Sequence, residues 1–108
     1  MTVPVSVLIP TRNEEKNIRK CLDSVSWAAE VYVVDSSSTD RTAELAQGQG
    51  ATVVQFSWDR QGPRKKNWAL DHLPWKYEWV LVVDHGGTQA TYATVYQRVL
   101  VEFHVIAR

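Results

Sequence analysis

The feature that most constrains this sequence is a hydrophobic pattern that changes its period several times along the chain. Four apolar, β-branched runs predict strands, and apolar residues at three- and four-residue spacing between them predict three helices. The predicted strands cover residues 3–10, 30–35, 51–56 and 78–84. The first predicted helix begins with a cap at Asn13. The second runs from a cap at Ser38 or Thr39 to Gln47, and the third covers residues 64–73. This alternation predicts an α/β fold, in which a mostly parallel sheet carries helices on both faces.

The end of the chain, residues 85–108, has a less regular pattern. Some of its apolar residues fit the spacing of a helix, while Val99, Val101, Phe103 and Val105 alternate as they would in a strand. The sequence is therefore consistent with either a helix or a strand in this tail.

Length and charge narrow the class of protein. A chain of 108 residues fits one compact domain. Twelve basic residues balance twelve acidic ones, and no basic stripe suggests nucleic acid as a partner. The single cysteine, Cys21, cannot form an internal disulfide, and no apolar run reaches the roughly 20 residues of a membrane helix. We therefore expect a cytoplasmic protein, and leave open peripheral contact with the inner face of the membrane.

Acidic residues end two of the predicted strands. Open parallel sheets bind ligands in the crevice beyond the carboxyl ends of their strands. Asp35 and Asp84 lie there, where a carboxylate can accept hydrogen bonds from a sugar, ribose or base, or hold a divalent cation. An aspartate that caps a helix or turn is an equally good interpretation of either position.

A cluster of basic residues surrounds the start of the third predicted helix. It contains Arg60, Arg64, Lys65 and Lys66. Three of these cations would lie in the first helical turn, where the helix dipole and free amides favour negative charge. A bound diphosphate would resolve that conflict, but flexible side chains on a solvated basic face explain the cluster equally well.

Three motifs in this order carry a resemblance to a known family. They are VSVLIPTRNEEKNIRKCLDSV, VYVVDSSSTDRTAELA and GPRKKNWALDH. Together they resemble the inverting family 2 glycosyltransferases with the GT-A fold, and most closely the bacterial branch that adds sugars during lipopolysaccharide core assembly. The resemblance covers residues 3–84. It implies a truncated, Rossmann-like nucleotide-sugar-binding GT-A half over residues 1–84, followed by a tail, 85–108, that matches no part of the family.

The resemblance also implies roles for individual residues. A loop around the nucleotide base and ribose would consist of Pro10, Thr11, Arg12, Asn13 and Glu14. Asp35 and Ser36 would border the base, and Lys66 would lie near the diphosphate. Asp84 would open the family's Asp-any-Asp motif, which holds Mg²⁺ or Mn²⁺. Because Gly86 replaces the second acid of that motif, the metal site would be weak or lost.

The implied reaction moves a sugar from a nucleoside diphosphate, UDP in particular, to a hydroxyl of a saccharide or lipid-linked acceptor. We cannot place in residues 85–108 the acidic residue that would deprotonate this hydroxyl, so we expect no turnover from this chain alone. One alternative is a non-catalytic remnant or interaction module that forms homo-oligomers through the tail. Another is a sugar-phosphate nucleotidyltransferase, which the absence of glycine from residues 10–16 disfavours.

Overall fold

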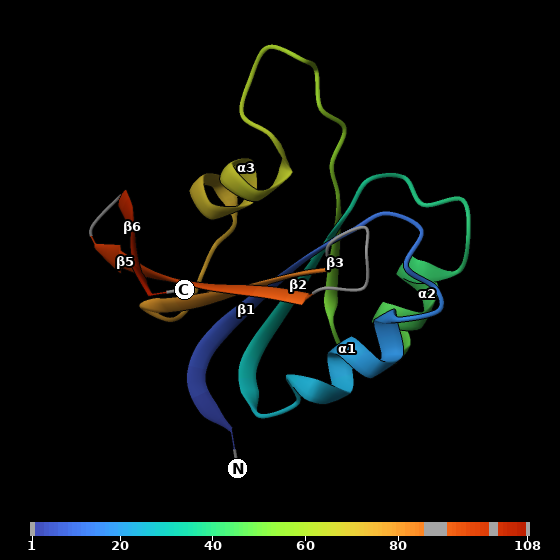
Figure 1. Cartoon of the computed structure of the whole chain (residues 1–108), viewed down its shortest axis with the longest axis horizontal. Coiled ribbons are helices and arrows are strands. Elements are labelled where there is room, and N and C mark those ends of the chain that lie inside the picture. Colours follow the sequence, from blue (N-terminus) through green and yellow to red (C-terminus); the bar gives the residue numbers. More distant parts are fainter. Residues whose placement is uncertain (1, 86–90, 100–101, 108) are drawn as a thin grey trace.

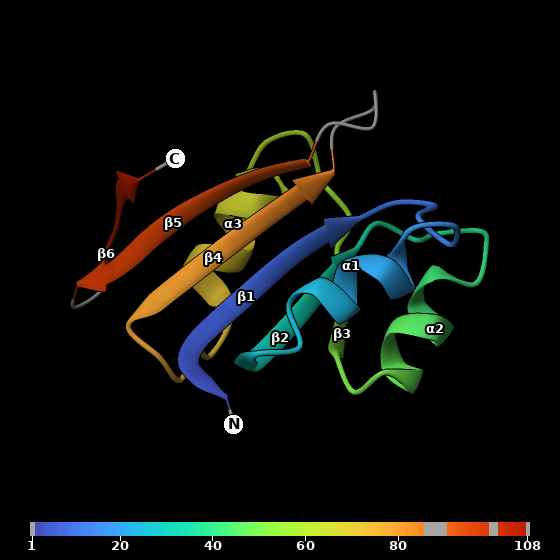
Figure 2. The same cartoon turned by 60° about the horizontal axis from the view of Figure 1, so that its bottom comes forward.

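Six strands form one sheet in the computed structural model of the chain, which describes residues 2–85, 91–99 and 102–107. The strands are β1 (Val3–Thr11), β2 (Ala28–Asp35), β3 (Thr52–Gln55), β4 (Trp79–His85), β5 (Thr91–Val99) and β6 (Glu102–Ala107). Their order across the sheet is β3-β2-β1-β4-β5-β6 (Figure 2). The pairings among β1 to β4 are parallel, and β5 and β6 are added antiparallel. The expected α/β fold with a mostly parallel sheet is confirmed.

Helices cover both faces of this sheet. They are α1 (Ile18–Ser24), α2 (Thr42–Gly48) and α3 (Lys65–His72). Helices α1 and α2 lie on one face and α3 lies on the other (Figure 1). Within the residues that the structure describes, no helix is long and apolar enough to cross a membrane.

The central strand β1 is buried on both faces, because its successive side chains point to opposite sides of the sheet. Val7 and Ile9 pack in one core cluster with Ile18 of α1. Leu8 packs in a second cluster with Ala69 of α3. The continuous apolar run in the sequence therefore reflects a strand that is covered by helices on both sides.

Within the tail, the described residues 91–99 and 102–107 form a strand pair, so the helical spacing was misleading. Strand β5 pairs with the free edge of β4 from His85 opposite Thr91 to Trp79 opposite Gln97, and Tyr96 is buried in the same core cluster as α3. Without β5, β4 would be an edge strand with unpaired backbone groups, and β5 supplies their partners. This pairing explains why strand structure prevails over helix, but Val99 and Phe103 belong to two different strands, and Val101 lies outside the described residues.

Two expected helix starts are wrong. Helix α1 begins after Asn17, while Asn13 lies outside it with a positive φ of 52°. Helix α2 begins at Thr42, well after Ser38, and no side chain of its N-cap residue caps it. The polar residues that could have capped these helices instead connect the two loops to each other.

Candidate functional site

The last residues of three parallel strands meet at one point of the sheet edge. Thr11, Asp35 and Gln55 end β1, β2 and β3 and lie side by side in register. The backbone ladder continues past them, since Ser36 N donates to Thr11 O at 3.0 Å and Phe56 N donates to Asp35 O at 2.9 Å. The loops that follow the strands therefore start from fixed positions.

Asp35 is the centre of this junction and is fully buried. Its Oδ1 accepts hydrogen bonds from Thr11 Oγ1 at 2.7 Å and from Ser38 Oγ at 2.5 Å. Its Oδ2 accepts from Ser38 N and Gln55 Nε2, each at 3.0 Å. A carboxylate offers about four acceptor positions, so protein donors already occupy those of Asp35.

The carboxyl group of Asp35 is held in its charged form. Burial raises its pKa, but the hydrogen bonds from Ser38, Thr11 and Gln55 outweigh burial and leave the pKa below its ordinary value. The predicted contact between Asp35 and a nucleotide base stays a prediction. A base that bound there would have to replace or share one of these donors.

The loop after β1 is held to the loop after β2 through consecutive backbone amides. Asn13 N donates to Ser38 Oγ at 2.8 Å, and Glu14 N donates to Thr42 Oγ1 at 2.8 Å. Glu15 N donates to Asp40 Oδ2 at 3.1 Å. The amides of residues 13–15 are thus held by side chains of the neighbouring loop and helix, while the Glu14 carbonyl accepts from Asn17 N and Ile18 N.

Two further contacts join the same loops. Asn13 Oδ1 accepts from Thr39 N at 2.8 Å and from Thr39 Oγ1 at 3.3 Å. Asp40 Oδ1 accepts from Thr42 N at 3.0 Å and from the Thr42 hydroxyl. The Thr42 hydroxyl, with the backbone amides of Thr42 and Glu15, holds the pKa of Asp40 below its ordinary value. In the described part of the chain, every buried side-chain nitrogen or oxygen has a hydrogen-bond partner.

The basic cluster divides between different partners. Lys65 Nζ donates to Thr11 O at 2.6 Å and so ties the first turn of α3 to the end of β1. Lys66 Nζ lies 5.8 Å from the ring centroid of Tyr96, and the guanidinium of Arg64 lies 4.5 Å from that of Trp58. The sequence predicted an individual role for Lys66 and none for Lys65. In the structure it is Lys65 that contacts the end of β1.

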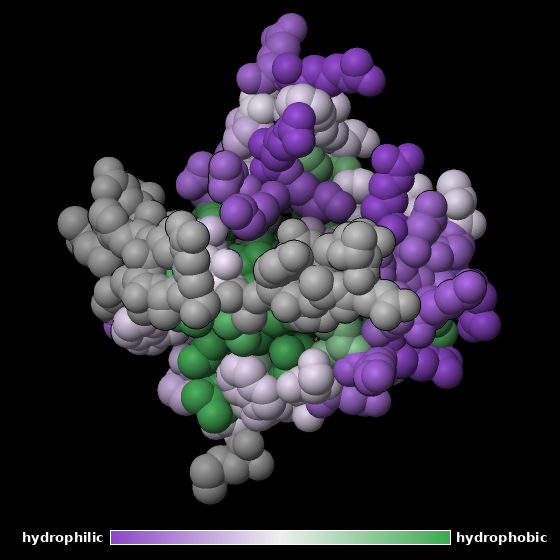
Figure 3. All heavy atoms as spheres, viewed as in Figure 1, coloured by the Kyte–Doolittle hydropathy of each residue, from purple (hydrophilic) through white to green (hydrophobic). Residues whose placement is uncertain are grey.

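The predicted site residues come from elements that meet at the carboxyl edge. Pro10 and Thr11 end β1, Arg12, Asn13 and Glu14 follow it, Asp35 and Ser36 lie at the end of β2, and Lys66 lies in the first turn of α3. The backbone of Asp84 lies near the end of β4, opposite Tyr92. Hydrophilic residues cover the loop before α3 and the surroundings of α1 and α2 in Figure 3. The sequence prediction thus named residues of one rim, and their roles stay predictions.

A cavity of about 650 Å³ lies on the α1 side of this rim. It shares Pro10, Thr11 and Glu14 with the predicted nucleotide loop and extends along α1 to Lys20 and Cys21. Burial, and secondarily the charge of Glu14, raise the pKa of the Cys21 thiol. Cys21 is therefore a neutral lining residue of the cavity.

The donor set for a divalent cation is small. Among the described residues there is no group of three His, Cys, Asp or Glu side chains that could hold a metal ion. The sequence offers Asp84 and no acid at Gly86, which itself lies outside the described residues. Mg²⁺ commonly takes one or two protein carboxylates and completes its shell with substrate phosphates and water. These residues fit a cation that is shared with a diphosphate, and do not fit one held by protein alone.

The fold is that of a GT-A glycosyltransferase domain, which comparison with known proteins supports. The chain belongs to glycosyl transferase family 2, whose family model matches residues 6–87. It is 39% identical over 93 residues to glycosyltransferase AglJ of Haloferax volcanii, covering 83% of this chain and 30% of that protein. It is 35% identical over 79 residues to the lipopolysaccharide core biosynthesis glycosyltransferase LpsC of Rhizobium meliloti, covering 68% of this chain and 29% of that protein.

Solved structures show the same similarity. Glucosyl-3-phosphoglycerate synthase from Mycobacterium tuberculosis, crystallised with Mn²⁺, UDP and glucosyl-3-phosphoglycerate, superposes with a TM-score of 0.59 at 32% identity, covering 74% of this chain and 32% of that one. The same enzyme with Mg²⁺ and UDP also gives a TM-score of 0.59. In each of these comparisons the chain spans about a third or less of its relative. The expected family and fold are confirmed.

Proposed function

We propose that this protein binds a nucleoside-diphosphate sugar, with UDP as the nucleotide, and forms the donor-binding part of an inverting glycosyltransferase. The acceptor would be a hydroxyl of a saccharide or of a lipid-linked sugar. Membership of family 2 and similarity to a structure that contains UDP support this proposal. The observation that carries it is the rim itself, where strand ends, two joined loops and the cationic start of α3 converge.

The charges of the rim suit a diphosphate. Lys66 is exposed in the first turn of α3, and its described contact is with an aromatic ring, so its charge is available to an anion. As the bond to the sugar breaks, negative charge grows on the leaving diphosphate, and a fixed cation stabilises that charge. We assign this role to Lys66.

A divalent cation would neutralise more of this charge when bound. We infer that Mg²⁺ or Mn²⁺ would be held by Asp84 together with the donor's phosphates. With a single carboxylate in the motif, the protein is expected to bind the metal measurably only when the nucleotide is present.

We further infer that the protein is cytoplasmic and does not transfer sugar by itself. A general base must lie within hydrogen-bond reach of the attacking hydroxyl, and we assign none to residues 85–108. The non-catalytic, oligomeric module is the second candidate function. The hydrogen bonds of Asp35 favour this candidate. Protein donors occupy the acceptor positions of its carboxylate, so Asp35 can serve as a structural residue without binding a nucleotide.

Calorimetric titration with UDP, with and without Mn²⁺, tests the proposal. We expect saturable binding that strengthens with Mn²⁺. Lys66→Ala should weaken it about 10-fold, the effect of losing one charge-assisted contact. Lys76→Ala is the matched control, because Lys76 is an exposed lysine close to the amino end of β4. Absence of heat at millimolar UDP would favour the non-catalytic module. Sugar transfer by the purified chain would refute the inference that the chain is inactive by itself.

A further inference from the structure

Three consecutive amides in the loop after β1 are held by three side chains of one short segment. The amides belong to Asn13, Glu14 and Glu15, and the acceptors are Ser38, Thr42 and Asp40. The partners are 25 to 28 residues apart in sequence. Residues 13–15 lie outside the helices and strands, and their only described backbone–backbone bonds are those that Glu14 O accepts from Asn17 N and Ile18 N at 2.9 and 2.8 Å. The three amides are therefore held by side chains of the other loop and the start of α2.

We propose that Ser38, Asp40 and Thr42 are positioning residues, which set the affinity for the nucleotide by holding the backbone of residues 13–15 in its binding conformation. They act through that loop and need not touch the nucleotide. This inference rests on the proposed function, because it assigns a use to the same rim.

The buried hydroxyl of Thr42 is the central member of this segment. It donates to Asp40 Oδ1 and accepts from Glu14 N, which uses its single proton and one lone pair. Thr42 is fully buried, so water cannot replace either contact. A loop already held in its bound shape loses less conformational entropy when a ligand binds, and therefore binds more tightly.

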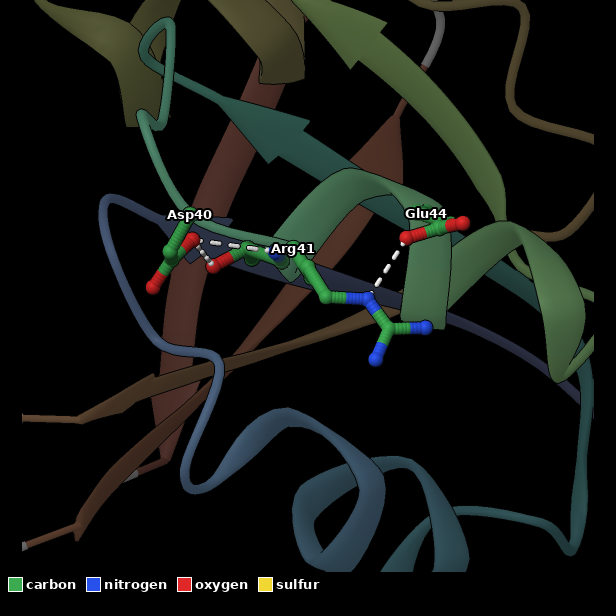
Figure 4. Close-up of polar contacts among 4 residues, drawn as sticks. Asp40, Arg41 and Glu44 are labelled. Atoms are coloured by element: carbon green, nitrogen blue, oxygen red, sulfur yellow. Dashed lines mark hydrogen bonds and ion pairs between the residues drawn. The ribbon is translucent and has the colours of Figure 1, made fainter.

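The start of α2 also provides a control variant that removes none of the hydrogen bonds to the three loop amides, although Arg41 does interact with the charge of Glu15. Arg41 Nε and Glu44 Oε2 form an ion pair of 2.7 Å, with side chains 62% and 68% exposed. Figure 4 shows Arg41 reaching along α2 to Glu44, while Asp40 turns to the start of the helix. Exposed pairs of this kind contribute little, so the double variant Arg41→Ala/Glu44→Ala should behave as wild type.

The experiment compares Thr42→Val, Thr42→Ser, Asp40→Asn and the Arg41/Glu44 control in the full chain. Amide hydrogen exchange reports on residues 13–15, calorimetry reports the dissociation constant for UDP, and thermal melting verifies folding. Thr42→Val should speed exchange at residues 13–15 and weaken UDP binding about 10-fold. Thr42→Ser retains the hydroxyl and should restore both values.

The two readouts separate this inference from the proposed function. Faster exchange at residues 13–15 with unchanged UDP affinity would overturn the inference, as would unchanged exchange in Thr42→Val. If Thr42→Val does not fold, Asp40→Asn tests the inference in its place. This variant keeps Thr42 and places an amide NH₂ against Glu15 N, so it should speed exchange at residues 13–15 and weaken UDP binding. If the wild type binds no UDP, the proposed function fails and the affinity effect fails with it, whereas exchange still decides whether the segment holds the loop.

Discussion

At the residue scale, Asp35 and Asn13 show how polar side chains build the rim. Asp35 is a fully buried carboxylate that accepts four hydrogen bonds from the ends of β1 and β3 and from the loop after β2. Asn13 takes a left-handed backbone conformation that short polar residues tolerate, and accepts two hydrogen bonds from Thr39. Their side chains determine where the loops lie.

Replacing Asp35 by Asn should destabilise the fold by about 2 kcal/mol. The amide places an NH₂ group where two donors now point, so buried donors lose their acceptor. Urea unfolding measures the change. Asp59→Asn is the control, because Asp59 accepts from Gln61 N and Gly62 N through Oδ1 alone, and an Asn oxygen can replace it. Equal stability of Asp35→Asn and wild type would contradict the structural role of Asp35.

The low pKa of Asp35 should make stability depend on pH. Its pKa in the folded state lies below the unfolded value of about 3.9, so its contribution is complete above that value. The contribution disappears as pH falls through the folded pKa. Urea midpoints measured from pH 6 to pH 2.5 should therefore fall less steeply in Asp35→Asn than in wild type. Parallel curves for the two proteins would refute this explanation.

At the scale of elements, one lysine of α3 adds a polar contact to the central strand, beside the core cluster that Ala69 shares with Leu8. Lys65 Nζ donates to Thr11 O, the same carbonyl that accepts Ser36 N. The neighbouring Lys66 is turned away from this bond by the helical rotation of about 100° per residue. Two adjacent lysines on α3 therefore differ in role, one in docking the helix and one available to ligand.

Lys65→Met should lower the free energy of unfolding by about 1–3 kcal/mol, because a hydrogen bond from a charged group is lost at a half-buried position. Lys66→Met should change it by less than about 0.5 kcal/mol, as is usual for exposed residues. Chemical denaturation of both variants makes the comparison. A larger loss in Lys66→Met would reverse the assigned roles.

At the scale of the whole molecule, the sheet has two edges, β3 and β6. Strands at an edge carry unpaired backbone groups and are common sites of self-association. Strand β3 is short, with four residues, while β6 has six. We infer that copies of the chain associate through the tail.

Size-exclusion chromatography with light scattering should find a homo-oligomer at high protein concentration. An added charge on an edge strand opposes such pairing. His104 pairs with Gln97, one position away from the pair of Val105 with buried Tyr96, and so falls on the other face of the sheet. His104→Lys in β6 should therefore shift the protein toward monomer, while Thr52→Lys in β3 should leave the mass unchanged. A monomeric wild type at high concentration would remove the tail as an interface.

The sequence by itself determined the elements whose signals are local. The apolar run of β1, the alternation of strands and helices, and the family motifs that follow β1 and β2 are all contained in short windows. Because parallel strands end at one edge, these windows were enough to place the candidate residues on one rim. The range of helix α3 was predicted within one residue at each end.

Tertiary structure decided everything that depends on partners distant in sequence. Asn13 and Ser38 could each cap a helix in isolation, and they bond across 25 residues because packing brings the two loops together. Lys65 donates to Thr11, 54 residues away in sequence. No local sequence pattern shows that Lys65, and not Lys66, makes this contact. The tail fits two periods, and the open edge of β4 selected the strand, because backbone groups left unpaired at that edge gain partners only from another strand.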